Sequence, residues 1–145
     1  DYLQAMTSQR HRSNREMELS TILRGMKELA RNNAVSVVAS SQLSRAVETR
    51  GGDKRPQLSD LRESGAIEQD ADKVLVLYRP EYYSILIDED GNDASNYVDL
   101  IVAKNKQGKT GEIEMYRNES FTGYYSRASG RKHFNIDDQS KFFNE

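Results

Sequence analysis

Apolar side chains recur at helical spacing in one segment of the chain. Between positions 19 and 30, leucine, isoleucine, methionine and alanine residues lie three or four positions apart, which gives a helix one apolar face. The four residues at 13–16, Ser-Asn-Arg-Glu, have the form of a capping box, in which Ser13 and Glu16 satisfy exposed amides at a helix start. The pattern therefore predicts a helix that begins at this box and ends near the asparagines at 32–33.

Short runs of consecutive apolar residues predict three buried β-strands, at 35–39, 74–77 and 100–103. Strands that are apolar on both faces need cover on both sides and are typical of parallel sheets in α/β proteins. The segments 112–116 and 121–125 alternate or carry aromatic residues and predict an antiparallel hairpin. Because one good helix cannot cover both faces of a sheet, we expect an α/β core that is part of a larger domain.

The remaining segments are mainly polar. Residues 1–4 resemble the end of a strand, and 58–71 has helical character but contains Gly65, so we expect a short or broken helix there. The acidic, turn-rich segment 81–96 predicts a surface excursion. The segment 126–145 is polar and lacks periodicity, which predicts a disordered tail.

Composition narrows the class of protein. The chain has 145 residues, enough for one domain, with 36% apolar residues, a mean hydropathy of -0.84 and a net charge of -2. A protein that binds DNA by charge alone is usually basic, so any DNA contact here must come from a few placed groups. The chain has no cysteine, which excludes disulfides and thiolate metal sites and suits a cytoplasmic protein.

Membrane and export signals are missing from the sequence. No apolar run approaches the roughly 20 residues that a membrane-spanning helix needs. The chain opens Asp-Tyr-Leu-Gln, with neither a basic n-region nor an initial methionine. We therefore expect no membrane association and a chain that begins within a larger protein.

Polar groups follow two of the predicted strands. Gln42 comes after the strand at 35–39, and Lys104 and Lys106 come after the strand at 100–103. The carboxyl ends of strands form the ligand crevice of open α/β sheets. A glutamine there can bond a phosphate oxygen or orient a water, and cations can reach a triphosphate, including one held by a neighbour. The plainer interpretations are a polar strand-to-loop turn and a basic hairpin turn.

Two further segments contain candidate phosphate or metal groups. Arg62 stands beside Glu63 and near Gly65, whose lack of a side chain allows close approach of the backbone, so the three could form a phosphate clasp. The plainer interpretation is a helix with an internal Arg–Glu pair. Asp1 could help hold Mg²⁺, as an aspartate at a strand end does in nucleotide-hydrolysing motors, or it could be a solvated terminus.

The order of the polar blocks resembles that of the bacterial replicative DNA helicases, the DnaB family. The resemblance extends from Asp1 to about Tyr125 and is most specific from Ser41 to Asp72. The blocks that carry it are DYLQ at 1–4, SQLSR at 41–45, KRP at 54–56, SDLRESG at 59–65, IEQDAD at 67–72, tyrosines and Arg79 within 78–83, and IVAK at 101–104.

The resemblance implies a fold and an activity. It identifies residues 1–125 as the C-terminal portion of a helicase ATPase domain, a truncated RecA-like P-loop NTPase core. The expected sheet is mainly parallel, with a C-terminal antiparallel hairpin, followed by the disordered tail 126–145. The family implies an ATP-dependent helicase that couples hydrolysis to translocation on single-stranded DNA and to unwinding at the replication fork. ATP with Mg²⁺ between the subunits of a homohexameric ring, single-stranded DNA, and primase and helicase loader as partners are implied with it.

The same resemblance assigns nucleotide-side roles. Asp1 is expected to act on Mg²⁺ and ATP. Gln42 is expected to sense the γ-phosphate and link it to the DNA loops. Lys104 and Lys106 match the finger that reaches a neighbour's ATP, so that Gln42, Lys104 and Lys106 are the expected catalytic residues. The family usually has arginine where Lys106 stands, and lysine lacks the planar bidentate fork of arginine.

On the DNA side, Arg62, Glu63 and Gly65 match the loop that holds the DNA backbone. The chain departs from the family in two further ways: 81–96 is longer and more acidic than expected, and no GxxxxGK[ST] phosphate loop is present. We therefore expect this chain alone to be inactive. Two alternatives stay open, namely a RecA-like recombination or repair ATPase and a non-catalytic truncated copy that only binds helicase subunits.

Overall fold

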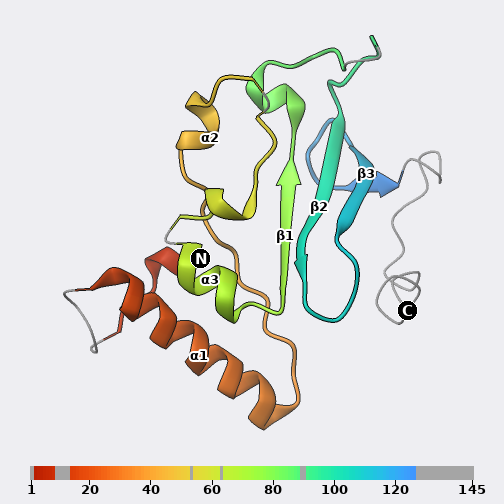
Figure 1. The fold of residues 1–145 in the computed structure, drawn as a ribbon. Coiled ribbons are helices and arrows are strands. Elements are labelled where there is room, and N and C mark those ends of the chain that lie inside the picture. Colours follow the sequence, from red (N-terminus) through yellow and green to blue (C-terminus); the bar gives the residue numbers. More distant parts are fainter. Residues whose placement is uncertain (1, 9–13, 53, 63, 89–90, 127–145) are drawn as a thin grey trace. The chain divides into compact units, whose positions relative to one another are not determined.

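The computed structural model describes residues 2–8, 14–52, 54–62, 64–88 and 91–126 (Figure 1). These residues belong to two compact units, each considered by itself. The first comprises Asp1–Arg50 and Pro56–Asp72, and the second comprises Gly51–Arg55 and Lys73–Glu145.

The first unit is helical. Its long helix α1 packs against the short helix α3 (Figure 1). Buried side chains of the two helices include Leu19 on α1 and Ala66 and Ile67 on α3. The broken helix expected over 58–71 is confirmed as a 3₁₀ turn followed by α3. The helical elements of the unit are η1 (Leu3–Ala5), α1 (Arg15–Asn33), α2 (Ala46–Thr49), η2 (Leu58–Asp60) and α3 (Ser64–Asp70).

Helix α1 begins one residue later than the capping box predicts. Asn14 is the N-cap, and its side chain accepts a hydrogen bond from the Met17 backbone N–H at 3.1 Å. Asparagine caps helices about as well as serine does, and Ser13 lies outside the described residues. The predicted end is confirmed, because α1 stops at Asn33 and Ala34 takes a left-handed conformation with φ 51°.

The second unit contains a four-stranded antiparallel sheet in the order β1-β2-β3-β4 (Figure 1). Its elements are β1 (Lys73–Tyr78), η3 (Pro80–Tyr83), β2 (Tyr97–Asn105), β3 (Gly111–Arg117) and β4 (Tyr124–Ser126). The predicted C-terminal hairpin is confirmed as β3 and β4. Ser126 belongs to β4 and not to a tail, and the rest of the expected tail, 127–145, lies outside the described residues.

The α/β class is confirmed, but the described strands pair antiparallel rather than mainly parallel. The parallel pairing among described residues is a single bridge between Tyr2 and Ser40. The segment 35–39 forms no strand, and Val38 within it is 95% exposed. An apolar run becomes a buried strand only when neighbours pair with its backbone and cover both faces, and the described residues do not supply them here.

Strand β1 is buried on one face only, contrary to the prediction of a fully buried strand. Val74, Val76 and Tyr78 are buried, whereas Leu75 and Leu77 are each 51% exposed. The alternation follows from the period of two in a strand, with cover on a single face of the sheet.

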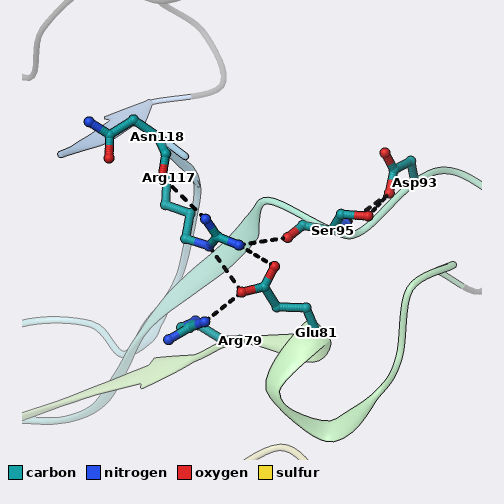
Figure 2. A network of polar contacts seen from close by, with 6 residues as sticks. All are labelled: Arg79, Glu81, Asp93, Ser95, Arg117 and Asn118. Carbon is teal, nitrogen blue, oxygen red and sulfur yellow. Dashed lines mark hydrogen bonds and ion pairs between the residues drawn. The ribbon is translucent and has the colours of Figure 1, made fainter. Parts of the chain in front are cut away.

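The acidic segment after β1 is anchored by Glu81 (Figure 2). Arg117 donates two hydrogen bonds to the Glu81 carboxylate, from Nε to Oε1 at 3.0 Å and from Nη2 to Oε2. Arg79 donates a third to Oε1 at 2.5 Å. The Arg117 guanidinium also lies 3.8 Å from the ring centre of Phe121, which has φ 59°. The predicted surface excursion therefore starts from a charged cluster that fixes it to β3.

Replacing a fully buried core valine should lower stability far more than replacing an exposed one. Val98→Ala removes side-chain volume at a position with 0% exposure, so the free energy of unfolding should fall by about 1.5–3 kcal/mol. Val38→Ala is the matched control and should change it by less than about 0.5 kcal/mol. Urea denaturation of the 145-residue chain measures both, and equal losses would contradict the assigned core.

The Glu81 cluster predicts a pH dependence. The hydrogen bond from Arg117 lowers the pKa of Glu81, burial opposes this, and the bond from Arg79 lowers it further. A carboxyl with a lowered pKa stabilises the fold above its unfolded pKa of about 4.3, and this stability is lost as the pH falls through the folded pKa. Glu81→Gln should therefore be less stable at pH 7 and lose less stability on acidification, as urea midpoints between neutral and acid pH will measure. Glu119→Gln, at an exposed position in the turn between β3 and β4, is the control and should keep the wild-type dependence of the urea midpoint on pH.

Candidate functional site

Gln42 and Arg62 lie side by side although twenty residues separate them in the chain. The Arg62 backbone N–H donates to the Gln42 carbonyl at 3.2 Å, and Arg62 Nη1 is 3.5 Å from Gln42 Oε1. An antiparallel bridge joins the adjacent residues Leu43 and Leu61. Two residues that were predicted to face different ligands are therefore directly connected, and both side chains are exposed.

A buried ion pair holds the segment that leads to Arg62. Arg50 pairs with Asp60, which is only 5% exposed, and Asp60 Oδ2 also accepts the Gln57 backbone N–H at 2.8 Å. Hydrogen bonds to both carboxylate oxygens fix the position of Asp60. The backbone that continues into Arg62 therefore starts from a fixed point.

Gln4 connects both predicted residues, and the sequence analysis missed it. Its Oε1 accepts the Gln42 backbone N–H at 3.1 Å, while its Nε2 donates to Ser41 Oγ at 3.0 Å and to the Arg62 carbonyl at 3.2 Å. The available signal was its place in the block at 1–4, three residues after Asp1, but no local pattern distinguishes it from any other polar residue.

The first turn of α1 fixes the backbone around Gln4. Arg15 donates to the Gln4 carbonyl at 2.8 Å and to the Met6 carbonyl at 2.9 Å. The same guanidinium pairs with Glu18 at 2.5 Å, and Glu18 accepts the Ser8 backbone N–H at 2.6 Å. Because Glu18 is 6% exposed, this ion pair is shielded from solvent and gives the segment 4–8 a defined path.

Gly65 has a close neighbour that accounts for a glycine at this position. A Cβ atom there would lie 2.8 Å from Oε1 of Glu16, so any larger residue requires the Glu16 side chain to move. Gly65 is exposed in the first turn of α3, near the exposed Arg62. The remaining predicted members of this part of the site, Asp1 and Glu63, lie outside the described residues.

Lys104 and Lys106 belong to the second unit. Lys104 is half-buried near the end of β2, opposite Val74 at a point where the strand register shifts. Lys106 is exposed in the turn that joins β2 to β3. The structure thus brings Gln42 and Arg62 together in one unit and the two lysines together in the other.

Asn105 holds the turn that carries Lys106. Its Oδ1 accepts the Gln107 backbone N–H and its Nδ2 donates to the Lys109 carbonyl, both at 3.3 Å. A Cβ atom at Gly108 would lie 2.7 Å from Asn105 Nδ2. Glycine at 108 therefore allows the amide of Asn105 to close the turn.

A buried carboxylate on β2 holds the segment Gly51–Arg55. Asp99 is 1% exposed, lies 2.7 Å from Arg55 Nη2, and accepts the Tyr97 hydroxyl at 2.6 Å. Burial, the bond to Asp99 and its charge raise the pKa of Tyr97 above its ordinary value. Burial opposes the charge of Arg55, but Asp99 and Glu112 together raise the pKa of Arg55.

The described part of the chain contains neither a cluster of metal-ligating side chains nor a membrane-spanning helix. It contains no group of three or more histidine, cysteine, aspartate or glutamate side chains arranged to hold a metal ion. None of its helices has the length and apolar character needed to cross a membrane.

The sequence of the chain matches a known protein family. The DnaB-like helicase C-terminal domain matches residues 1–126. The chain belongs to this family. The predicted resemblance is confirmed, and with it the relation of the fold to helicase ATPase domains.

Curated DnaB relatives match over most of the chain. The replicative DNA helicase DnaB of Rickettsia felis is 43% identical over 136 residues, covering 86% of this chain and 27% of that protein. The protein of the same name from Geobacillus stearothermophilus is 47% identical over 116 residues, covering 79% and 24%. This chain therefore spans about a quarter of the length of the curated relatives it matches.

Two solved structures share this fold over most of the chain. A DnaB-like replicative helicase, studied with its interactions with primase, has a TM-score of 0.74 and 40% identity, over 86% of this chain and 29% of that one. An ATPase domain of known structure has a TM-score of 0.75 and 40% identity, over 87% of this chain and 42% of that one. At this identity, the DnaB family relation and the structural likeness agree.

Proposed function

We propose that this chain is part of the ATPase domain of a hexameric replicative DNA helicase. That protein couples ATP hydrolysis to translocation on single-stranded DNA and to duplex unwinding at the replication fork. The observation that carries the proposal is the direct hydrogen bonding between Gln42 and Arg62 within a chain of the DnaB family. A hydrogen bond between a residue proposed to face ATP and a residue proposed to face DNA supports coupling between the two ligands.

On the nucleotide side, we propose that Asp1 acts on Mg²⁺ and that Gln42, Lys104 and Lys106 face the phosphates of ATP. An exposed carboxamide and an exposed cation fit a triphosphate, since its oxygens accept hydrogen bonds from both. Bound Mg²⁺ would neutralise charge on the transferring phosphoryl group. Gln42 would bond a phosphate oxygen, and Lys104 and Lys106 would stabilise charge on a neighbouring subunit's ATP.

On the DNA side, we propose that Arg62, Glu63 and Gly65 hold the backbone of single-stranded DNA. The exposed guanidinium of Arg62 suits bidentate binding of a phosphate, and Gly65 is exposed in the first turn of α3 close to it in the chain. Such contacts position the strand without reading its sequence. A motor that moves along any DNA sequence needs this kind of contact.

The rest of the helicase must complete the nucleotide site. The chain lacks the GxxxxGK[ST] loop, whose backbone amides and lysine cradle the phosphates of ATP. We propose that the loop comes from the remainder of the full-length protein, so the 145-residue chain alone should show no ATP turnover. We also propose single-stranded DNA, five further copies of the protein, a primase and a helicase loader as its partners.

Arg62→Ala in the full-length helicase should weaken binding of single-stranded DNA and flatten its dependence on salt. Each lost phosphate contact should lower the slope of log affinity against log salt by about 0.7. Fluorescence anisotropy of a labelled oligonucleotide at several salt concentrations measures this slope. Arg24→Ala on α1, whose side chain is 72% exposed, is the matched control and should keep the wild-type slope. An unchanged slope in Arg62→Ala would remove Arg62 from the DNA site.

Lys106→Ala should bind ATP but hydrolyse it poorly, because we propose that Lys106 acts on the ATP of a neighbouring subunit. Fingers of this type contribute roughly 10³–10⁵ in rate when they are arginines, and lysine, a strongly hydrated point charge, should contribute less. Lys109→Ala in the same turn is the matched control and should keep wild-type turnover.

Mixed rings test the action across the boundary. Adding subunits that lack the phosphate-loop lysine but keep Lys106 should restore part of the turnover of Lys106→Ala subunits. If mass spectrometry shows both variants in the same rings and turnover stays at the level of the separate variants, Lys106 does not act across the boundary.

A further inference from the structure

We propose that Gln4 is the positioning residue that couples the nucleotide-facing and DNA-facing segments of the helicase. The inference rests on the proposed function and adds a residue to it. Gln4 accepts from the Gln42 backbone N–H with the oxygen of its carboxamide and donates to Ser41 and Arg62 with the nitrogen. Its side chain joins Gln42 and Arg62 to the segment 2–4.

The three contacts require a carboxamide. Oε1 accepts from the Gln42 N–H at 3.1 Å, and both hydrogens of Nε2 are used, toward Ser41 Oγ at 3.0 Å and the Arg62 carbonyl at 3.2 Å. A glutamine offers one acceptor and two donor hydrogens in a plane. The opposite orientation of the amide would place its NH₂ against an N–H and its oxygen against a carbonyl. The partners therefore fix its orientation, and neither glutamate nor methionine reproduces the set.

The backbone of Gln4 is held on both sides. Before it, the Leu3 N–H donates to the Ser40 carbonyl at 2.9 Å, and Tyr2 forms the parallel bridge to Ser40. After it, Arg15 donates to the Gln4 carbonyl at 2.8 Å. Leu3 is 4% exposed, which anchors the segment in the core. Gln4 is thus a fixed point to which exposed segments are attached.

Gln4 adds a side-chain link to the backbone pairing of the two segments. The Arg62 N–H donates to the Gln42 carbonyl at 3.2 Å and the Ser44 N–H donates to the Asp60 carbonyl at 2.7 Å, while the Gln4 amide bonds both the Gln42 N–H and the Arg62 carbonyl. A shift of the Gln42 backbone must therefore move the Gln4 amide or break its bond at Oε1. Because Nε2 of the same amide holds the Arg62 carbonyl, the change reaches the residue that faces DNA.

The test uses the full-length helicase with two variants of Gln4 and one control. Gln4→Met keeps the length of the side chain and removes all three hydrogen bonds. Gln4→Glu keeps an acceptor for Gln42 but places a carboxylate oxygen against the Arg62 carbonyl. Gln69→Met, an exposed glutamine of α3, makes the same chemical change away from the site.

The readout is the linkage between the two ligands. In the wild type, a non-hydrolysable ATP analogue should change the Kd for a single-stranded oligonucleotide, and the oligonucleotide should stimulate ATP hydrolysis. In Gln4→Met and Gln4→Glu, the effect of the analogue on Kd should shrink by about fivefold or more, within the usual range of coupling between sites. The ratio of turnover with DNA to turnover without it should fall in the same variants, and Gln69→Met should match the wild type in both. A purely structural role would lower the melting temperature and leave the linkage intact in rings that still form.

Two outcomes separate the claims. If the wild type shows linkage and both Gln4 variants form rings that keep it, the coupling role is wrong while the proposed function stands. If Gln4→Met does not assemble, Gln4→Glu decides alone, and linkage retained in its rings overturns the role. A wild type that shows neither linkage nor DNA-stimulated turnover overturns the proposed function and this inference together.

Discussion

A hydrogen-bonded junction of three chain segments sets the relative position of Gln42 and Arg62 in the first unit. The backbone N–H and C=O groups of the segments 2–4, 40–43 and 61–62 need hydrogen-bond partners outside the long helices. They satisfy one another through the Tyr2–Ser40 and Leu43–Leu61 bridges and through the Gln4 amide. Arg62 and Gln42 stand at this junction as exposed ends of an otherwise fixed network. Their relative position is therefore a property of the junction and not of either loop alone.

Buried carboxylates fix the segments around this junction and in the second unit. Glu18, Asp60 and Asp99 are 6%, 5% and 1% exposed, and each is paired with an arginine. Burying such a pair gains little net stability, because desolvation offsets the attraction, but removing one partner leaves an uncompensated charge in the interior. We interpret the three pairs as devices that select one arrangement of the loops. This is what exposed groups need when they must meet ligands at set positions.

Local patterns in the sequence predicted the elements that depend on local interactions. The long helix, the interrupted helix over 58–71 and the C-terminal hairpin follow from the spacing of apolar residues and from turn residues. The segment 35–39 and the second face of β1 were predicted wrongly, because burial depends on partners elsewhere that a local run of valines or leucines does not reveal. Gln4 and its bond to Arg62, 58 positions away, left no periodic signal at all. The family resemblance predicted which residues to examine, and the contacts among them came from the structure.

The acidic composition of the chain explains why these positioning contacts matter. The whole chain has a net charge of -2, so a net positive charge does not attract DNA to it, and the placement of each arginine matters more. Affinity must then come from short-range contacts, which decay within a few ångströms and depend on geometry. The guanidinium of Arg62 is exposed. Its position is set by the backbone bond to Gln42, by the Gln4 amide and by the Arg50–Asp60 ion pair two residues earlier in the chain. In the proposed DNA site, neutral and acidic residues such as Gln4 and Asp60 therefore hold the arginine in place.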